Sequence, residues 1–370
     1  MAIAGTIQKK SATRSTLSKW SVVLESGGLL IILAALILFF GLNPTSGSAF
    51  LSGANITNLL GNQSVTGIVA LAMVIPLVSG YFDLSVAAVA GMANVTVAAT
   101  MSSYGLPIYA ALLIGIAVAL VAGCINGYLV AGLRLNGFIV TLGTYTLIGG
   151  LLQFYTNGHS IYENIPVALG EWGMIKIFGV PSPFFLLISV AIVAWYILMH
   201  TPFGRRLEAI GSNESAARLV GIRVDRSIFT SFVLSSLLAG VAGVLLTSRS
   251  GGADPNAAPA YLFPALTAVF LGATAIRPGR YNVWGTIIGV FLVAIAVNGL
   301  TLMGADTWIT PVFNGAALVG AIAVSTLIGR HRARAADRTS ANDEYGRGPS
   351  SSGGESPTSG AELTRNGARS

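Results

Sequence analysis

Long apolar runs separated by short polar connections fill most of this chain and limit the folds open to it. A helix of about 20 apolar residues spans the hydrocarbon core of a bilayer, where only helices and closed barrels pair every backbone N–H and C=O group. We therefore predict an all-α integral membrane protein with about ten transmembrane helices. The predicted spans cover approximately residues 22–42, 65–82, 84–101, 107–130, 138–155, 184–199, 228–246, 262–275, 283–303 and 309–328.

Two segments fit this scheme less well than the others. The run at 262–275 is short for a span and contains Pro264, which cannot donate a helical hydrogen bond. We expect this run to be broken or re-entrant. Residues 51–62 mix apolar with polar side chains, and we interpret them as an interfacial segment.

The charge content agrees with a membrane protein. Charged residues make up 9% of the chain, whereas soluble domains carry about 25%. The formal net charge of +7 comes mainly from the tails and polar loops, which indicates contact with anionic lipid and no nucleic-acid binding. The single cysteine, Cys124, excludes an internal disulfide, and the three histidines are too scattered for a Cys/His metal site. We therefore predict no metal.

The sequence divides into a membrane domain and two tails. Residues 1–21 carry four basic side chains and are predicted to form a cytoplasmic tail. A basic stretch before an apolar run also describes a signal peptide, but this run is long and no cleavage site follows, so we interpret it as an uncleaved first helix. Residues 22–329 form the predicted transmembrane domain. Residues 330–370 lack the apolar content for a core, and we expect a disordered cytoplasmic tail.

The basic residues predict an orientation. If the N-terminus is cytoplasmic, ten spans place Arg134, residues 203–226, Arg277 and Arg280 on the cytoplasmic side, as the positive-inside rule requires. Only Lys176 and Arg249 go against the pattern. Both termini are then cytoplasmic. Spans two to five start outside and spans seven to ten start inside, which predicts an inverted repeat of two halves.

The most charged internal stretch, residues 203–226, also predicts a short helix. Asn213 can cap its start, Glu214 suits its first turn, and Gly221 can end it. So short a helix is marginal alone, and its apolar face needs a partner. Either it is a linker helix packed on the protein's own surface, or it is a docking surface for a cytoplasmic partner. The residues of that apolar face are Ala216, Leu219 and Val220.

Polar side chains inside the predicted spans indicate a path for a solute. Asp83, between the second and third spans, is either the cap of the third span or a functional acid at membrane depth. Uncharged polar residues in spans more often bond a neighbouring helix. Collectively, amides without buried charge nevertheless fit a path for a neutral hydrophilic solute better than one for an ion. The path candidates are Asp83, Asn94, Asn126, Thr141, Gln153, Asn298 and Asn314, with Thr144 nearby.

Four stretches carry a resemblance to a known family. They are SGYFDLSVAAVAG at 79–91, NGFIVTLGTYTLIGGL at 136–151, FGRRLEAIGSNESAARLVGI at 203–222 and LTAVFLGATAIRPGRYNVWGTIIGV at 266–290. In this order they resemble the permease subunits of bacterial ABC importers for ribose, xylose and related sugars, over about residues 50–330. The resemblance implies a multi-pass protein of the bacterial cytoplasmic membrane that translocates a monosaccharide, such as a pentose. It further implies that ATP is bound and hydrolysed on a separate subunit and that this chain is not itself an enzyme.

The resemblance also implies partners. These are a cytoplasmic ABC ATPase, an extracytoplasmic sugar-binding protein, a second permease copy in a homodimer, and membrane lipid, with no cofactor bound by this chain. The short helix at 213–221 would be the coupling element that fits a cleft in the ATPase. The residues implied at that contact are Arg205, Arg206, Glu208, Gly211, Asn213, Glu214, Ala216, Ala217, Arg218 and Gly221.

Two other classes of protein were weighed against this interpretation. An ion-coupled secondary transporter of a small polar solute needs ionisable groups along its spans, and these are sparse here. A membrane-embedded enzyme needs a nucleophile or metal site, but the sequence has no Walker A, HExxH or GxSxG motif. We therefore predict no catalytic residues.

Overall fold

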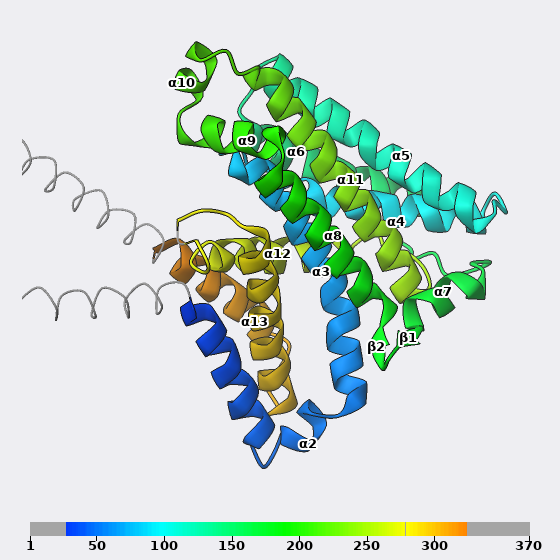
Figure 1. Cartoon of the computed structure of the whole chain (residues 1–370). Helices are drawn as coiled ribbons and strands as arrows, with labels where there is room; N and C mark the ends of the chain where they lie inside the picture. Colours follow the sequence, from blue (N-terminus) through cyan, green and yellow to red (C-terminus); the bar gives the residue numbers. More distant parts are fainter. Residues whose placement is uncertain (1–26, 278, 324–370) are drawn as a thin grey trace, which may run out of the picture. The chain divides into compact units, whose positions relative to one another are not determined.

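Helices make up most of the computed structural model, which describes residues 27–277 and 279–323 (Figure 1). Within these residues, strands β1 (Lys176–Ile177) and β2 (Val180–Pro181) form a short antiparallel hairpin. The protein is therefore all-α, as predicted. The predicted tails, residues 1–21 and 330–370, lie outside the described residues.

Each of the ten predicted runs falls on an apolar helix. Six helices are long and apolar enough to cross a membrane. They are α3 (Gly53–Val78), α5 (Ile108–Gly127) with its π-helical extension η1 (Tyr128–Gly132), α6 (Gly137–Thr156), α8 (Ser182–His200), α11 (Val224–Ser250) and α13 (Val283–Leu302). The shorter apolar helices are Gly27–Leu42, α4 (Val86–Ser102), α12 (Ala258–Gly272) and Ile309–Ala323.

Four further helices join these elements. They are α2 (Gly47–Phe50), α7 (Val167–Met174), α9 (Pro202–Ser212) and α10 (Glu214–Leu219). The run at 262–275 forms α12, a single short helix with Pro264 inside it. It is thus short, as expected, but it is not broken.

Residues 51–62 were predicted to be an interfacial segment, and this prediction is wrong. Residues from Gly53 onwards belong to α3, which starts at the cap Ser52, whose side chain accepts a hydrogen bond from the backbone N–H of Asn55 at 3.2 Å. The polar residues of this segment do not end a helix, because a helix pairs its own backbone groups whatever its side chains are. The polarity of the segment therefore reflects what its side chains face, not a break in the helix.

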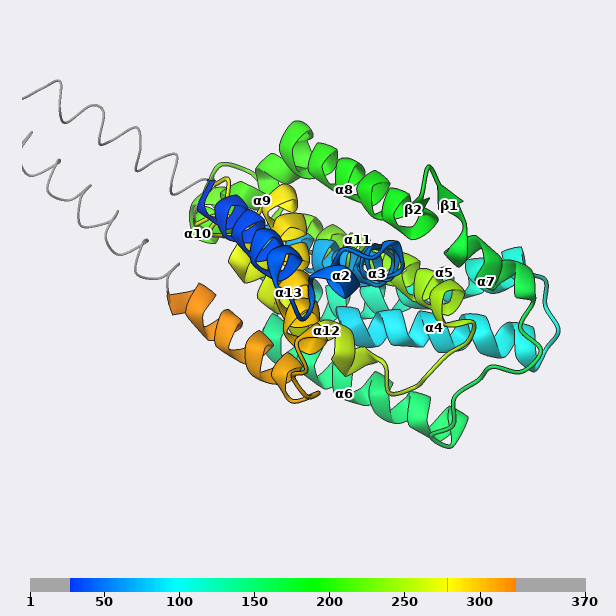
Figure 2. The same ribbon diagram turned by 90° about the horizontal axis from the view of Figure 1, so that it is seen from below.

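The centre of the fold is α3, which packs against α8, α11, α12 and α13 (Figure 2). Its residues from Val65 to Leu77 are buried. Glycines let the helices around it approach closely, as the small-residue patterns predicted. A Cβ atom added at Gly243 on α11 would lie 2.3 Å from the carbonyl oxygen of Ala90 on α4. One added at Gly289 on α13 would lie 2.3 Å from the carbonyl oxygen of Ala268 on α12.

The connections between helices separate into two faces. On the first, here called the α10 face, Arg134 Nη2 lies 3.6 Å from Asp225 Oδ2 and Arg280 Nη1 lies 3.9 Å from Glu208 Oε2. These are the basic connections predicted to share one side. On the second, here called the hairpin face, a β-bridge joins Ile161 to Ala253. The α7 and β-hairpin region lies far from α9 and α10 (Figure 1).

The two predicted halves run in opposite senses. Helix α3 ends at the α10 face, since the C-terminal residue Val78 lies against Gly211 of α9. Helix α11 begins at that same face, because Asp225 in its first turn pairs with Arg134. First helices of opposite direction are what an inverted repeat of two halves requires.

The close contact at Gly243 gives a first prediction. In Gly243→Leu, the added side chain must displace the α4 backbone, and overpacking of this kind costs about 1–3 kcal/mol or more. We expect a lower midpoint of thermal unfolding for the purified protein in detergent. The matched control is Gly143→Leu on α6, where no atom lies within 4 Å of the added Cβ position. Equal stability of the two variants would contradict the packing described above.

Candidate functional site

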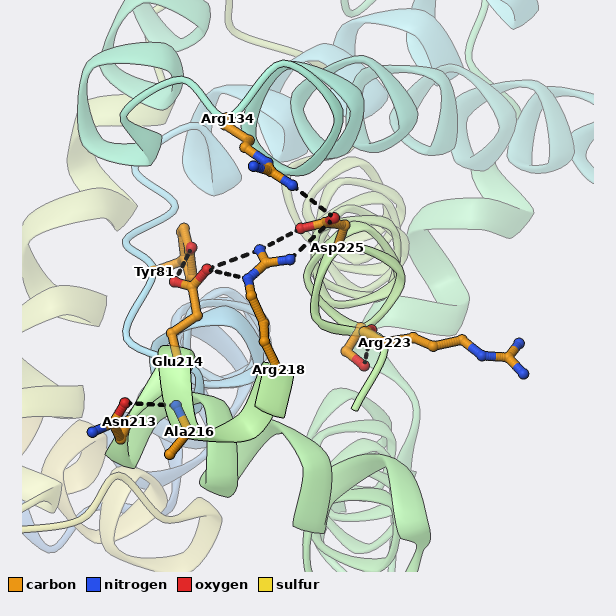
Figure 3. Close-up of polar contacts among 9 residues, drawn as sticks. Tyr81, Arg134, Asn213, Glu214, Ala216, Arg218, Arg223 and Asp225 are labelled. Atoms are coloured by element: carbon orange, nitrogen blue, oxygen red, sulfur yellow. Dashed lines mark hydrogen bonds and ion pairs between the residues drawn. The ribbon is translucent and has the colours of Figure 1, made fainter. Parts of the chain in front are cut away.

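The short helix α10 is capped at both ends as the sequence predicted. At its start, the side chain of Asn213 accepts a hydrogen bond from the backbone N–H of Ala216 at 2.9 Å (Figure 3). At its end, Gly221 has φ +84° and donates its N–H to the carbonyl of Arg218 at 3.1 Å. Glycine is favoured at this position, because it adopts the left-handed backbone conformation without strain. The six residues of α10 are therefore held in shape by local bonds.

Arg218 lies at the centre of an ionic network on the α10 face. Its Nη2 atom lies 2.9 Å from Glu214 Oε1 and 2.5 Å from Asp225 Oδ1 (Figure 3). Arg134 approaches the other oxygen of Asp225. The hydrogen bonds to Asp225 and Glu214 raise the pKa of Arg218 above its ordinary value. Exposed ion pairs add little stability singly, but this network fixes α10 against the start of α11.

A second contact ties α10 to the connection between α3 and α4. The hydroxyl of Tyr81 donates to Glu214 Oε2 at 2.9 Å (Figure 3). Partial burial, followed by the hydrogen bond to the Glu214 carboxylate, raises the pKa of Tyr81 to about 12. The phenol therefore keeps its proton at neutral pH and remains a hydrogen-bond donor.

The same connection places Asp83 in the protein core. Its side chain is 1% exposed, and its oxygens accept hydrogen bonds from Ser85 N–H at 3.1 Å and from Ser235 Oγ at 3.0 Å. Ser85 Oγ in turn accepts from Asn126 Nδ2 at 2.9 Å, and Asn126 Oδ1 accepts from Thr144 at 2.7 Å. Asp83 bonds Ser85, the residue that precedes α4, but it does so inside the core and not at the surface.

Residues 79–85 therefore connect α10 with the interior. Tyr81 contacts α10, Asp83 contacts α11, and Ser85 leads through Asn126 on α5 to Thr144 on α6. We call these residues the linking segment. The sequence pointed to Asp83 but gave no sign of the Tyr81 contact, because the two partners are 133 positions apart.

The apolar face of α10 points away from the protein. Leu219 is 88% exposed and Val220 is 77% exposed, and Ala216 is exposed as well. Only Ala217 turns inward, where it packs with Ile210. The apolar side chains of Leu219 and Val220 are therefore not buried against the protein itself, although other residues of α10 are held on its surface.

The predicted residues of α9 are exposed or half-buried. Arg205 and Arg206 are exposed. Glu208 approaches Arg280. Gly211 packs so closely on Val78 that an added Cβ would lie 2.3 Å from its carbonyl oxygen, so its role is to let the two helices touch.

A hollow of about 440 Å³ lies beside α10. It runs along the junction of α9, the end of α10 and the start of α11, and basic and apolar side chains share its wall. Its lining residues are Phe203, Arg206, Val220, Gly221, Ile222, Arg223, Arg226, Ser227 and Thr230.

Most of the polar residues predicted along a solute path are hydrogen-bonded within the protein. Asn94 donates to Thr247 Oγ1 at 2.9 Å between α4 and α11. Thr141 donates to the Gly137 carbonyl of its own helix at 2.8 Å. Gln153 is exposed and bonds Asn256. These residues, like Asp83 and Asn126, are not brought together in one cavity.

Two of the path candidates do share a cavity. Asn298 and Asn314 line a hollow of about 500 Å³. Three further polar residues of α3 line it as well. Sequence reasoning missed Asn62 because it placed residues 51–62 outside the spans, and it did not single out the other two. The four-residue spacing of Asn62 and Thr66, which puts both on one helical face, was the available signal. The missed residues are Asn62, Gln63 and Thr66.

The chain is similar to known transport proteins over most of its length. A family model described as "Branched-chain amino acid transport system / permease component" matches residues 55–322, well over half of the 370 residues. The chain belongs to this family. The permease thus matches its family across every helix from α3 to the helix Ile309–Ala323, and the linking segment, α10 and the polar hollow all lie within the matched region.

Curated relatives of the permease are sugar import permeases. It is 31% identical over 326 residues to the ribose import permease of Haemophilus influenzae, covering 87% of this chain and 99% of the relative. It is 34% identical over 302 residues to the ribose import permease of Bacillus subtilis, covering 81% and 92%. The D-allose transport system permease of Escherichia coli strain K12 is 28% identical over 322 residues, covering 87% and 98%. No solved structure gave a significant match.

These findings confirm the resemblance to the permeases of ABC sugar importers. The permease is an integral membrane component of a transport system and not a catalytic enzyme. The sites of interest are therefore contact surfaces and a passage for solute, in place of a catalytic centre.

The contact between Tyr81 and Glu214 gives a second prediction. Tyr81→Phe removes the donor to a carboxylate, and we expect it to lower the free energy of unfolding by about 1 kcal/mol at neutral pH. A raised pKa means that the folded protein holds the phenolic proton more tightly than the unfolded chain. This stabilisation is complete below pH 10.0 and is lost as the pH rises toward about 12. The stability difference between wild type and variant should shrink over that interval.

Thermal unfolding of the purified protein in detergent, followed from pH 7 to pH 12, measures both effects. Tyr128→Phe is the matched control, because that ring lies on η1 and is 58% exposed. If Tyr81→Phe and Tyr128→Phe behaved alike at every pH, the tie between α10 and the linking segment would make no energetic contribution.

Proposed function

We propose that this permease is the translocation subunit of an ABC importer that carries a neutral monosaccharide, a pentose or a related sugar, into the cell. ATP hydrolysis on a separate cytoplasmic subunit drives the transport, and this chain binds no cofactor itself. An extracytoplasmic sugar-binding protein delivers the sugar. Two copies of the permease form a homodimer in the lipid of the cytoplasmic membrane, with both termini inside.

The observation that carries the ATPase contact is the exposed apolar face of α10. Leu219 and Val220 stand almost free on a helix whose ends are both capped. Exposed apolar side chains on a rigid, short element are typical of an anchor that fills a pocket in a partner. Arg206 and Arg223 line the hollow beside Val220, and Arg205 is exposed on α9. These basic side chains suit an acidic rim on the ATPase.

The linking segment supplies the route by which a moving ATPase acts on the spans. A displacement of α10 acts on Tyr81 through Glu214 and therefore moves residues 79–85. Asp83 transmits that movement to α11 through Ser235, and Ser85 transmits it to α5 through Asn126. Because these bonds lie in the interior, where the dielectric constant is low, they resist stretching more than exposed contacts do. The helix and the spans then move together.

The solute class follows from the polar side chains and the relatives. Ribose and D-allose, named for two relatives, are uncharged polyols that bond equally well to amides and hydroxyls. Among the described residues, Asp83 is the one buried acid, and its oxygens are engaged by hydroxyl and N–H donors. This engagement does not favour the ion-coupled secondary transporter, which needs a titrating acid open to its ion.

The α10 anchor gives a third prediction. In Leu219→Ser combined with Val220→Ser, the permease should fold and insert normally, since both side chains are exposed. ATPase copurification and sugar uptake should each fall about tenfold or more, because anchor residues of an interface contribute about 2 kcal/mol or more. The measurement is the amount of ATPase retained on the tagged permease after gentle solubilisation, together with the initial rate of uptake of labelled ribose.

Leu133→Ser is the matched control for this experiment. Leu133 is 50% exposed and precedes Arg134 on the α10 face, but it does not belong to α10. The control should keep both ATPase and uptake. Normal uptake by the double variant would exclude α10 as the coupling element.

A further inference from the structure

The hollow that Asn298 and Asn314 share opens among the hairpin-face ends of four helices. It lies between the first half of α3, the first turns of α12, the last turns of α13 and the first turns of the helix Ile309–Ala323. Arg249 shows where the hollow lies, because this residue is in the last turn of α11 at the hairpin face and contacts Asn62, which lines the hollow. The hollow therefore lies on the opposite side of the protein from α10.

The polar lining of the hollow is uncharged. Amides and hydroxyls both donate and accept hydrogen bonds, so together they match a solute that has many hydroxyls and no charge. A volume of about 500 Å³ lies within the usual range of small-molecule sites, about 300–1,000 Å³. The polar residues of the lining are Asn62, Gln63, Thr66, Tyr261, Asn298, Thr301, Thr310 and Asn314.

One lining residue has an acceptor that nothing in the described structure satisfies. Asn314 is 5% exposed, and its Oδ1 atom is buried without a hydrogen-bond partner. Its backbone carbonyl is used, because Thr267 donates to it at 3.1 Å. A buried acceptor without a partner costs about 1–3 kcal/mol, so a persistent one calls for a ligand or water. Because the Oδ1 atom is buried, a hydroxyl donor in the hollow meets it only when the Asn314 side chain turns toward the hollow.

Arg249 holds Asn62 in the wall of the hollow that α3 forms. Its Nη2 atom donates to Asn62 Oδ1 at 2.8 Å, and its Nη1 atom donates to the Gly173 carbonyl of α7 at 3.2 Å. The guanidinium fits because the nearest residue of α3 is glycine: a Cβ atom at Gly61 would lie 2.7 Å from Arg249 Cζ. With its oxygen taken by Arg249, the amide of Asn62 has its two N–H donors left for the hollow.

Arg249 is also one of the two basic residues that go against the positive-inside pattern. An arginine at the end of a span can extend to the membrane surface, but this one turns toward the protein instead. Its contacts with α3 and α7 show that it is used inside the protein and is not a topological signal.

We propose that this hollow is the site at which the permease receives its neutral polyol, and that Arg249 is a positioning residue that orients Asn62 toward the solute. The inference rests on the proposed function for the solute class. Asn314 supplies an acceptor from one wall and Asn62 a donor from the other, so both sides of a sugar ring are addressed. The solute then meets the hollow before any passage toward the α10 face.

The test uses cells that express the complete transporter and measures the initial uptake of labelled D-ribose and D-allose over a range of concentrations. Three variants address the site. Asn314→Leu removes the free acceptor. Asn62→Asp keeps an oxygen for Arg249 but removes the two N–H donors. Arg249→Gln removes the clamp while leaving Asn62 in place. Thr100→Val on α4 is the control, because its hydroxyl bonds only its own helix.

We expect Asn314→Leu and Asn62→Asp to raise the KM or lower the maximal rate so that their ratio falls about tenfold or more, as the loss of a buried hydrogen bond does. Arg249→Gln should lower the same ratio. Arg249→Lys, which keeps the charge but not the forked donors, should recover only part of it. Asn62→Asp should unfold at the wild-type temperature, which separates a role in solute contact from a role in folding.

The outcomes distinguish the two proposals. If the wild type takes up neither sugar nor any other neutral monosaccharide tested, the proposed function fails. If the wild type takes up sugar and the Asn314 and Asn62 variants do so with unchanged KM and maximal rate, the hollow is not the receiving site. If Arg249→Gln loses thermal stability but keeps its uptake parameters, Arg249 has a structural role only.

Discussion

The absence of water from the hydrocarbon core is the constraint on which this structure depends. Each backbone polar group there must find its partner within the protein, and the described spans meet the requirement as helices. Side chains follow the same rule. Hydroxyls of Ser64, Thr146 and Thr301 each bond a carbonyl one turn earlier in their own helix. Polar residues can therefore enter a span without lining any passage, and polarity alone is a weak guide to function in a membrane protein.

Within that constraint, the linking segment connects the surface helix α10 with the interior of the protein. A short non-helical connection would ordinarily be the most flexible part of a membrane protein. Here it contains a buried carboxylate with hydroxyl and N–H donors around it and a tyrosine bonded to the surface helix. The least regular piece of backbone is thus one of the best connected, and it joins a surface element to the interior.

How far the sequence predicts the protein depends on the range of the signals. The helices, the caps at Asn213 and Gly221, and the glycine contacts follow from local rules, and the structure agrees with them. The partner of Tyr81 and the neighbours of Asn314 do not, because those contacts join residues far apart in the chain. Asn94 and Asn314 look alike in sequence, yet one bonds Thr247 across a helix pair and the other lines a hollow. Only the packing of the folded protein distinguishes the surroundings of these two residues.

The contact of Gly243 with Ala90 also determines how the protein can move. When backbone touches backbone, with no side chain between, two helices can tilt about the contact point but cannot slide along each other without a clash. Helices α4 and α11 therefore behave as one rigid lever, and α5 joins them through Gly123, where an added Cβ would lie 2.6 Å from Ser236. The glycines of α6 at positions 143, 149 and 150 have open space around them instead. Helix α6 is thus less tightly packed at its glycines than the helices of this lever.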